Sequence, residues 1–296
     1  MKIFDCFMYF DEEVVLDVRL NHLCNFVDYF VIVESKFTHK GEERSLKFDI
    51  NKFSKFKSKI LYLVVDKQPE NIEQIFETDS EDKKNNKYIM NALYRENFQR
   101  NFIIHGLKNA NSEDMILLSD VDEIPKLENI DFSSIKEKII LFQQDMFYYK
   151  FNLSIPNFKW TGTKGCRFKN FQSPQWLRNI KDRKYLFYRL DTYFSETKYI
   201  SINIIKDGGW HFSNIKNAED IEYKLKSYLH HREFDLESLS IEQIKEIIKN
   251  KKAIYDLNVD KTVNKVGTGK TLENFDKKKL PVYIQENENL LNEWIE

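Results

Sequence analysis

One stretch near the middle of the chain limits the possible folds more than any other. Four apolar residues, Met115 to Leu118, run directly into Ser119-Asp120-Val121-Asp122-Glu123-Ile124-Pro125. A short apolar run of this kind is typical of a central strand in a parallel sheet. If the strand stays extended, Asp120 and Asp122 point to the same side of it. The stretch therefore predicts an α/β fold with carboxylates gathered at one edge of its sheet.

Carboxylates in that position favour a metal site. Their hard oxygen atoms suit Mg²⁺ or Mn²⁺ carrying a phosphate-bearing ligand. Open α/β sheets also bind their ligands at the carboxyl ends of strands. An Asp-x-Asp pair arises easily by chance, so an acidic turn that only keeps a loop soluble is the alternative.

The composition limits the class of protein. The 296 residues are 42% hydrophobic and 15% aromatic, which is enough for a sizeable core in one large α/β domain or two small ones. The 46 basic and 47 acidic residues nearly cancel. No electrostatic case for nucleic-acid binding follows.

Cysteine usage and the N-terminal residues bear on the compartment. Cys6, Cys24 and Cys166 are widely spaced, which argues against a disulfide framework or a structural zinc site. The first residues lack the pattern of a signal peptide. No stretch approaches the roughly 18 consecutive apolar residues that a membrane span needs. We therefore expect a cytoplasmic protein without a transmembrane segment.

Strand and helix patterns alternate through the first half of the chain. Leu16, Leu20 and Leu23, for example, lie on one face of a helix. The patterns predict strands at 2–9, 29–33, 60–65 and 115–118, and helices at 12–25 and 87–109. Such alternation is typical of a nucleotide-binding α/β sheet.

The second half of the chain is less regular. It predicts strands at 139–143, 146–151 and 198–205, and helices at 217–231, 240–256 and 287–295. Gly208 and Gly209, which precede Trp210-His211, imply that the backbone there passes close to another part of the molecule. No internal repeat and no clear domain boundary is visible.

Several stretches, taken in order, carry a resemblance to a known family. The match is best over Ser119 to Pro125. The others are Phe4-Asp5-Cys6-Phe7 with Glu12 and Leu16-Asp17-Val18-Arg19-Leu20, Val27 to Ser35 with Thr38 and Gly41, Arg95-Glu96-Asn97 with Gln99-Arg100, Gly208 to Ser213, Lys224 to Tyr228 with His230, and Leu280 to Tyr283 with Glu286-Asn287. Together they resemble glycosyltransferase family 17. The chain departs from the family at Asp11, where the family usually has Asn.

The resemblance implies a GT-A fold, a Rossmann-like mixed sheet with flanking helices, in a single catalytic domain over residues 1–296. Residues 1–150 would bind a nucleotide sugar, and residues 151–296, with the C-terminal helices, would lie on the acceptor side. The implied reaction is a metal-dependent, inverting transfer of a sugar onto a glycan acceptor. By analogy with the family, the donor would be UDP-GlcNAc and the sugar N-acetylglucosamine.

The acidic stretch fits this chemistry. A diphosphate leaving group needs its developing negative charge neutralised, and a divalent ion that bridges both phosphates does this. Asp122 is the first candidate ligand, with Asp120 or Glu123 beside it, and Asp120 could also contact the donor ribose. The resemblance adds His211 as a further ligand, which would favour Mn²⁺ over Mg²⁺. A core histidine packed beside Trp210 is the alternative.

Donor contacts are expected from strand ends and from one helix. Glu34 and the loop from Phe7 to Glu12 follow strands at the ligand-binding edge of the sheet. Arg95 and Arg100 could reach a phosphate or the donor sugar, or could form ion pairs on the helix surface. The donor-binding candidates are Phe7, Glu12, Arg19, Glu34, Arg95, Arg100 and Asp120.

Inversion by direct displacement needs a general base that takes the proton of the acceptor hydroxyl. The candidates are Glu123, Asp145, Asp182, Asp207 and Glu233, and the sequence does not choose among them. Asp207 is favoured because it lies just before the glycine pair and His211, and Glu123 is the second choice.

Two other functions fit parts of the sequence. An apolar strand followed by Asp-x-Asp is also found in phosphatases and phosphotransferases, where Asp120 would be the nucleophile and Asp122 the acid/base. Against this, Ile124 occupies the position of the usual Thr or Val. A non-catalytic carbohydrate-binding protein could instead stack sugars on Trp160, Trp176 and Trp210.

Overall fold

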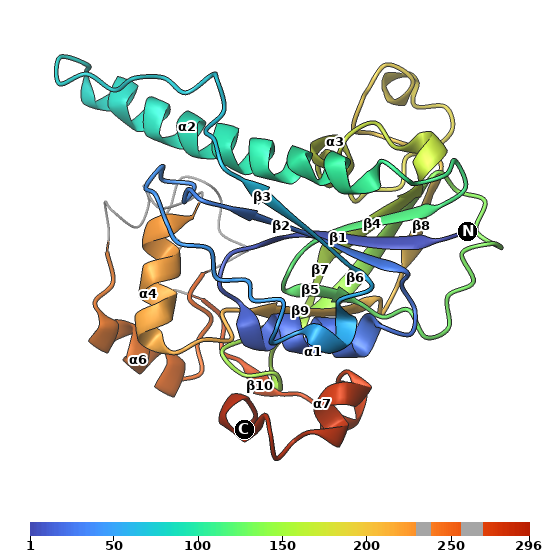
Figure 1. The fold of residues 1–296 in the computed structure, drawn as a ribbon. Coiled ribbons are helices and arrows are strands. Elements are labelled where there is room, and N and C mark those ends of the chain that lie inside the picture. Colours follow the sequence, from blue (N-terminus) through green and yellow to red (C-terminus); the bar gives the residue numbers. More distant parts are fainter. Residues whose placement is uncertain (229–237, 256–268) are drawn as a thin grey trace.

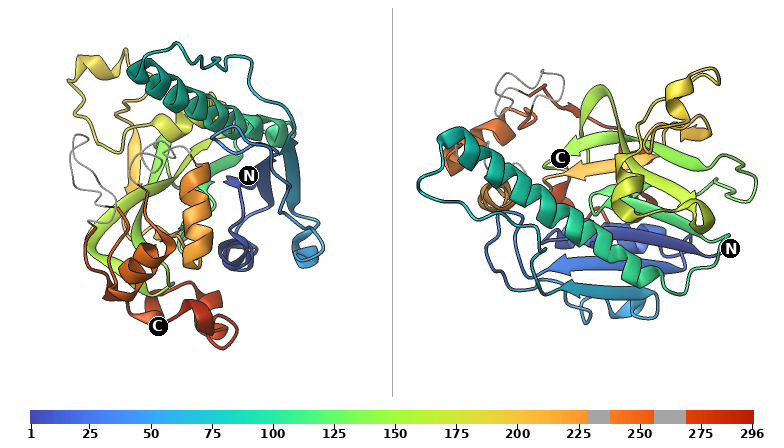
Figure 2. Two further views of the ribbon diagram at one scale, coloured as in Figure 1. Left: turned by 90° about the vertical axis from the view of Figure 1, so that its left-hand side faces the viewer. Right: turned by 90° about the horizontal axis from the view of Figure 1, so that it is seen from above.

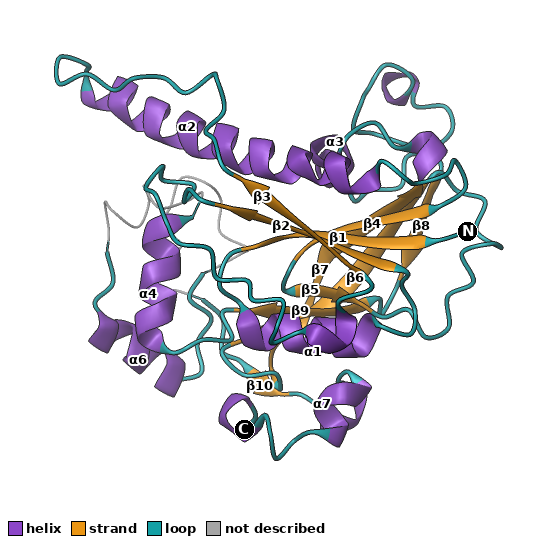
Figure 3. Cartoon of the chain, in the orientation of Figure 1, coloured by secondary structure: helices purple, strands orange, loops and turns teal. Residues whose placement is uncertain are grey.

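The structure is a computed structural model that describes residues 1–228, 238–255 and 269–296. In these ranges ten strands form one mixed sheet, which curls as it crosses the molecule and has helices on both faces (Figures 1 and 3). The strand order is β3-β2-β1-β4-β7-β6-β9-β5, with β8 paired to β6 and β10 paired to β7. The predicted mixed α/β architecture with flanking helices is confirmed.

The first half of the chain builds the parallel part of the sheet. Its elements are β1 (Ile3–Tyr9), α1 (Glu13–Leu23), β2 (Tyr29–Ser35), β3 (Ile60–Val65), α2 (Glu81–Asn101) and β4 (Met115–Asp120). The pairs β1–β2, β1–β4 and β2–β3 are all parallel, so the carboxyl ends of the four strands share one edge. Because β2 and β4 flank β1, the strand order reverses beside β1, which is where open α/β sheets bind ligands.

Alternating side chains give this part of the sheet two cores. Phe7 and Ile32 pack on the side of α1, whereas Cys6 and Val31 pack on the side of the 3₁₀ turn Phe102–Leu107. This follows from the period of two along a strand, with both faces of a central strand buried. Helices α1 and α2 accordingly lie on opposite faces, and α2 runs across the strands when the molecule is seen from above (Figures 1 and 2).

The second half of the chain extends the sheet with strands of mixed direction. It contains β5 (Glu123–Pro125), β6 (Ile139–Tyr148), β7 (Leu153–Arg167), α3 (Pro174–Asn179), β8 (Ile202–Ile205), β9 (Gly209–Ser213), α4 (Ala218–Ser227), α6 (Ile241–Lys249), β10 (Glu273–Asn274) and α7 (Val282–Glu286). Strand β7 pairs antiparallel with both β4 and β6, and so joins the two halves. Helices α4 and α6 share a third core with β6 and β7.

Two strand predictions were wrong in the same region. The predicted strands 139–143 and 146–151 are one strand, β6, because its polar middle keeps pairing with β7 through register shifts. Strand β7 itself was not predicted. The reason is that its middle, from Pro156 to Thr161, is partly exposed and breaks the apolar pattern.

Four helices also have bounds that differ from the predicted ones. Helix α2 begins at Glu81, six residues before the predicted start at 87, because the Ser80 side chain caps it by accepting a bond from the Lys83 amide. The final helix is Val282–Glu286 and not 287–295. Its start follows Pro281, which is suited to the first turn of a helix. Helix α4 ends at Ser227 and not at 231, because the backbone of Tyr228 is extended. Helix α6 ends at Lys249 and not at 256, because Lys251 takes a positive φ of 48°. No helix in the described ranges is both long and apolar enough to cross a membrane.

Candidate functional site

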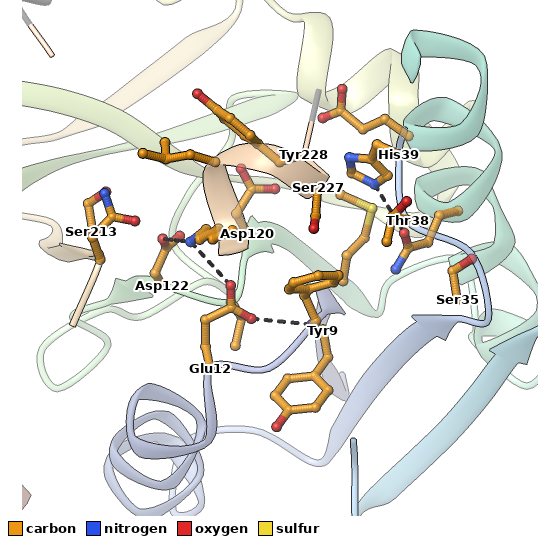
Figure 4. Close-up of a pocket in the computed structure, with 18 of the residues that line it drawn as sticks. Tyr9, Glu12, Ser35, Thr38, His39, Asp120, Asp122, Ser213, Ser227 and Tyr228 are labelled. Carbon is orange, nitrogen blue, oxygen red and sulfur yellow. Dashed lines mark hydrogen bonds and ion pairs between the residues drawn. The ribbon is translucent and has the colours of Figure 1, made fainter. Parts of the chain in front are cut away.

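A cavity of about 260 Å³ lies at the carboxyl ends of β1, β2 and β4. Strand β9 and helix α4 complete its wall (Figure 4). The lining residues are Met8, Tyr9, Phe10, Glu12, Ser35, Phe37, Thr38, His39, Arg44, Glu96, Gln99, Asp120, Val121, Asp122, His211, Ser213, Asn214, Lys224, Leu225, Ser227, Tyr228 and Tyr255. The cavity therefore occupies the sheet edge at which the sequence predicts ligand binding.

Asp122 and His211 meet in the cavity wall. Strand β5 pairs antiparallel with β9 in a register that sets Glu123 opposite His211. As a result His211 Nε2 lies 3.5 Å from Asp122 Oδ1. Burial lowers the pKa of His211 and raises that of Asp122, but the attraction between the two side chains outweighs burial. The pKa of His211 is therefore raised and that of Asp122 is lowered.

Gly209 makes this strand pairing possible. Its φ is +131°, and a Cβ atom there would lie 2.1 Å from the carbonyl oxygen of Ile124. A side chain at this position would thus collide with the backbone of β5, and the φ value is one that glycine adopts without strain. The predicted close approach is confirmed, and its partner is the strand that follows Asp122.

Arg178, which the sequence did not single out as a site residue, holds two carboxylates of the acidic stretch. Its Nη2 lies 2.7 Å from Asp120 Oδ2, and its Nη1 lies 2.8 Å from Glu123 Oε2. Arg100 reaches the other oxygen of Asp120, with Nη2 3.4 Å from Oδ1. Arg178 sits on α3, 58 positions from Asp120 along the chain. No spacing rule could have linked the two residues.

Glu123 lies behind the cavity wall and has no exposed surface. Its carboxylate accepts hydrogen bonds from Trp160 Nε1 over 2.7 Å and from the Asp120 amide over 2.8 Å, in addition to Arg178. These bonds fix the turn between β4 and β5. Glu123 does not line the cavity.

Arg19 lies beneath the same turn and is fully buried. Its Nη2 is 2.6 Å from Asp5 Oδ1. Its Nη1 donates to the carbonyl oxygens of Asp120, Val121 and Glu123 over 3.1, 3.1 and 2.8 Å. Arg19 therefore shapes the backbone that presents Asp120 and Asp122, and it does not line the cavity.

Two lysines from the second half of the chain meet the acidic residues that follow β1. Lys224 Nζ, on α4, lies 3.2 Å from Glu12 Oε1 and 3.8 Å from Asp122 Oδ2 (Figure 4). Lys216 forms an ion pair with Asp11. Burial lowers the pKa of Lys224, but the two nearby carboxylates outweigh it and the pKa is raised. Lys224 is thus an ammonium ion in the cavity wall.

Three predicted donor contacts lie outside the cavity and support it. Phe7 belongs to the core on the α1 side. Glu34 is fully buried and accepts bonds from the backbone amides of the loop after β2, at residues 47 and 48. Arg95 Nη1 donates to the carbonyl oxygens of His39 and Lys40, each over 3.2 Å. Both polar residues hold the loop that carries Ser35, Thr38 and His39 into the cavity.

None of the general-base candidates that the structure describes lines the cavity. Asp207 has an exposed side chain and pairs with Lys159 Nζ over 2.8 Å, in a second hollow that Asp145 shares. Asp182 is exposed on a distant loop. Glu233 lies outside the described residues. Among the described residues, the carboxylates that line the cavity are Glu12, Glu96, Asp120 and Asp122.

Asp122 and His211 fit a divalent ion that arrives with its own ligands. One carboxylate and one imidazole face each other, and His211 Nδ1 is buried without a hydrogen-bond partner among the described residues. Within those residues no group of three or more His, Cys, Asp or Glu side chains is arranged to hold a metal ion. Mg²⁺-type sites commonly use one or two protein ligands and complete their coordination with phosphates and water. The fit is therefore to a metal–phosphate ligand and not to a closed metal cage.

The fold and the cavity together define a class: an α/β protein with an acidic ligand site at the carboxyl ends of parallel strands. Residues 1–292 match the sequence model of glycosyltransferase family 17, and the chain belongs to that family. The rat and human proteins called beta-1,4-mannosyl-glycoprotein 4-beta-N-acetylglucosaminyltransferase are each 27% identical to it in an alignment 238 residues long, which covers 73% of this chain. The chain spans 40% and 41% of those two relatives. The predicted family is confirmed, and the phosphatase and lectin-like alternatives are set aside.

Proposed function

We propose that the protein is a metal-dependent, inverting glycosyltransferase of GT-A fold. It transfers N-acetylglucosamine from UDP-GlcNAc to a glycan acceptor. The observation that carries this proposal is the Asp122–His211 pair in a cavity at the strand-order reversal, in a chain of glycosyltransferase family 17. The choice of sugar rests on the names of the rat and human relatives.

In this proposal Asp122 and His211 hold a Mn²⁺ or Mg²⁺ ion, with Asp120 beside them. A bound ion of this kind neutralises the charge that develops on a diphosphate leaving group. The carboxylate and imidazole are separated by 3.5 Å, so they need little movement to share one ligand. An imidazole ligand favours Mn²⁺ over Mg²⁺.

Lys224 is proposed as a second positive charge for the leaving group. Its ammonium lies between Glu12 and Asp122, and the carboxylates keep it protonated. A preorganised cation in a water-poor cavity stabilises developing negative charge more strongly than the same cation in water. Lys216 is not given this role, because it does not line the cavity and forms an ion pair with Asp11.

The uridine part of the donor is proposed to lie toward β2. Figure 4 places Thr38 and His39 at the opposite end of the cavity from Asp122 and Glu12. Ser35, Thr38 and His39 offer hydroxyl and imidazole groups there, and Gln99 Oε1 lies 3.2 Å from His39 Nε2. Hydroxyl and amide side chains of this kind can bond to ribose and uracil.

The general base is proposed to be Glu12 or Glu96, the two cavity carboxylates that are not assigned to the ion. Asp207, which the sequence favoured, points into a different hollow and is already paired with Lys159. A base must come within hydrogen-bond reach of the proton that it accepts. From its place in the structure, Asp207 does not reach a substrate bound beside Asp122.

The test is turnover of nucleotide sugars by four proteins. Wild type, Asp122→Asn, Lys224→Met and Asp207→Asn are incubated with Mn²⁺, a mixture of glycans as acceptors and a panel of nucleotide sugars, and acceptor-dependent nucleotide release is followed. We expect release from UDP-GlcNAc, lost on addition of a chelator. Asp122→Asn and Lys224→Met should lower kcat by about 100- to 1,000-fold, as loss of one charge-stabilising group does. Asp207→Asn should stay within about twofold.

Two further measurements test the stereochemistry of the transfer and the binding of the metal ion. The anomeric configuration of the product, read by NMR, is expected to be inverted relative to the donor. Mn²⁺ binding to the free protein, followed by electron paramagnetic resonance, should be weakened in Asp122→Asn and kept in Asp207→Asn. Full activity of Asp122→Asn, or turnover that chelators leave intact, would remove the metal from the proposal.

We also propose that the protein is cytoplasmic. The three cysteines are unpaired, and Cys6 and Cys166 are buried. This suits a reducing cytosol, and cell fractionation would test it.

A further inference from the structure

A loop far from the cavity exposes an unusual density of apolar side chains. Phe187 is 76% exposed and Phe194 is 89% exposed. Six large hydrophobic side chains are exposed within nine consecutive positions: Leu186, Phe187, Tyr188, Leu190, Tyr193 and Phe194. The other exposed large hydrophobic side chains of the described residues are scattered along the chain. Clustered apolar exposure on a folded protein marks an interaction surface.

The loop is held in this exposed position by its own hydrogen bonds. At its base the Lys181 amide donates to the Thr197 carbonyl over 2.9 Å, and Trp176 Nε1 donates to the Glu196 carbonyl over 2.8 Å. Near its tip the buried Thr192 hydroxyl donates to the Arg189 carbonyl over 2.6 Å. These bonds hold the two ends of the loop together. It projects beside α3 in all three ribbon views, coloured yellow (Figures 1 and 2).

The residues that flank the apolar tip have a small excess of basic over acidic side chains. Between positions 181 and 198 there are five basic and three acidic residues: Lys181, Arg183, Lys184, Arg189 and Lys198 against Asp182, Asp191 and Glu196. Asp191 is neutralised inside the loop, because Arg189 Nε lies 2.8 Å and Lys198 Nζ 2.9 Å from its carboxylate. The charged residues that remain exposed are three basic, Lys181, Arg183 and Lys184, and two acidic, Asp182 and Glu196, which leaves a basic excess of one.

We propose that the loop from 181 to 198 seats the protein on an anionic lipid membrane. The convex tip supplies Phe, Tyr and Leu side chains, and amphipathic aromatic rings are enriched at the bilayer interface. Lysine and arginine beside such a tip gain from the negative surface potential of anionic lipids. An apolar tip and a basic base together match the two parts of a lipid surface, its acyl boundary and its headgroups.

The experiment is co-sedimentation of the full chain with two kinds of vesicle, phosphatidylcholine alone and phosphatidylcholine with phosphatidylglycerol. We expect the protein to bind the anionic vesicles, and to bind the neutral vesicles at least about tenfold more weakly. Phe187→Ser/Phe194→Ser should weaken binding at least about tenfold by loss of apolar insertion. The matched control is Phe76→Ser/Leu290→Ser, which removes two exposed apolar side chains outside the loop and should leave binding unchanged.

The charges have their own matched pair of variants. Arg183→Glu/Lys184→Glu should weaken binding at least about tenfold, whereas Lys57→Glu/Lys67→Glu, exposed lysines elsewhere, should not. Circular dichroism first establishes that each variant is folded. No binding to anionic vesicles, or equal binding by Phe187→Ser/Phe194→Ser and wild type, overturns the proposal. So does a loop-dependent dimer in sedimentation velocity without vesicle binding, which would make the partner a second copy of the chain.

Discussion

At the level of single residues, the acidic turn is organised by pairing every carboxylate with at least one cation. Asp122 faces His211 and Lys224, Asp120 faces Arg178 and Arg100, and Glu123 is held behind the wall by Arg178. Carboxylates this close together would otherwise repel one another and resist ionisation. The arrangement leaves Asp122 and Asp120 ionised at the cavity, while Glu123 serves the backbone.

A buried lysine next to this network gives a pH-dependent prediction. Lys164 Nζ, on β7, donates to the carbonyl oxygens of Arg178 and Ile180 over 2.6 and 2.5 Å. Burial, together with the charge of Arg178, lowers the pKa of Lys164 from 10.5 to about 8. Between these values the unfolded chain binds a proton that the folded chain has released. The contribution of Lys164 to the free energy of unfolding therefore rises with pH across this window.

We expect the stability difference between wild type and Lys164→Met to move in favour of wild type as the pH rises from 8 to 10. The slope should approach about 1.4 kcal/mol per pH unit. Urea unfolding of both proteins at matched pH values measures it. A difference that stays constant across this range would show that Lys164 releases no proton on folding there.

At the level of elements, the β5–β9 pair is what assembles the site. It brings the end of β4 and the start of α4 to one place, because His211 lies opposite Glu123 and α4 follows β9 closely. The pairing depends on Gly209, whose missing side chain leaves room for the Ile124 carbonyl. A disturbance of this one strand pair should therefore reach both Asp122 and Lys224.

Gly209→Ala tests this dependence. The added Cβ would clash with the Ile124 carbonyl oxygen at a positive φ, so we expect the free energy of unfolding to fall by at least about 2 kcal/mol. Asp207→Gly is the matched control in the same turn, because Asp207 has a φ of +50° and an exposed side chain that glycine can replace without strain. Urea unfolding compares the two. Equal stabilities would mean that β5 can move away from β9 at little cost.

At the level of the whole molecule, the C-terminal segment and strand β7 tie the two halves of the chain together. The C-terminal segment returns to α1, where the Tyr283 hydroxyl donates to Asp17 Oδ2 over 2.8 Å and Leu280 and Ile284 enter the same core. Strand β7 pairs with β4 of the first half and β6 of the second. Neither residues 1–150 nor residues 151–296 can leave without exposing the core of the other.

This interlocking predicts a single cooperative unfolding transition, as expected for one domain over residues 1–296. Far-UV circular dichroism and tryptophan fluorescence should then give the same urea midpoint. Trp160, Trp176, Trp210 and Trp294 all report on the second half. If fluorescence changed at a lower urea concentration than circular dichroism, the two halves would be separate folding units.

The strands and helices of the first half could be read from the sequence because their signals are local. Apolar runs and 3.6-residue spacing depend only on neighbouring residues, so β1, β2, β3, β4 and α1 lie where they were expected. Strand β7 was missed because its middle is partly exposed, which hides the period. The predicted position of the last helix was wrong because Pro281, which directly precedes the helix, was not recognised as a start signal.

The acidic strand end, the distant histidine and the family could all be recognised in the sequence, because each depends on residue types in a fixed order. The pairing of cations with carboxylates could not, because it depends on the folded chain. Arg19 and Arg178 lie 101 and 58 positions from Asp120, and their contacts depend on strand register and on how α1 and α3 pack. Asp207 lines a different hollow from the cavity, although only four positions separate it from His211. The chemistry of a side chain can be read at its own position in the sequence, whereas the distance between remote residues is set by the folded sheet.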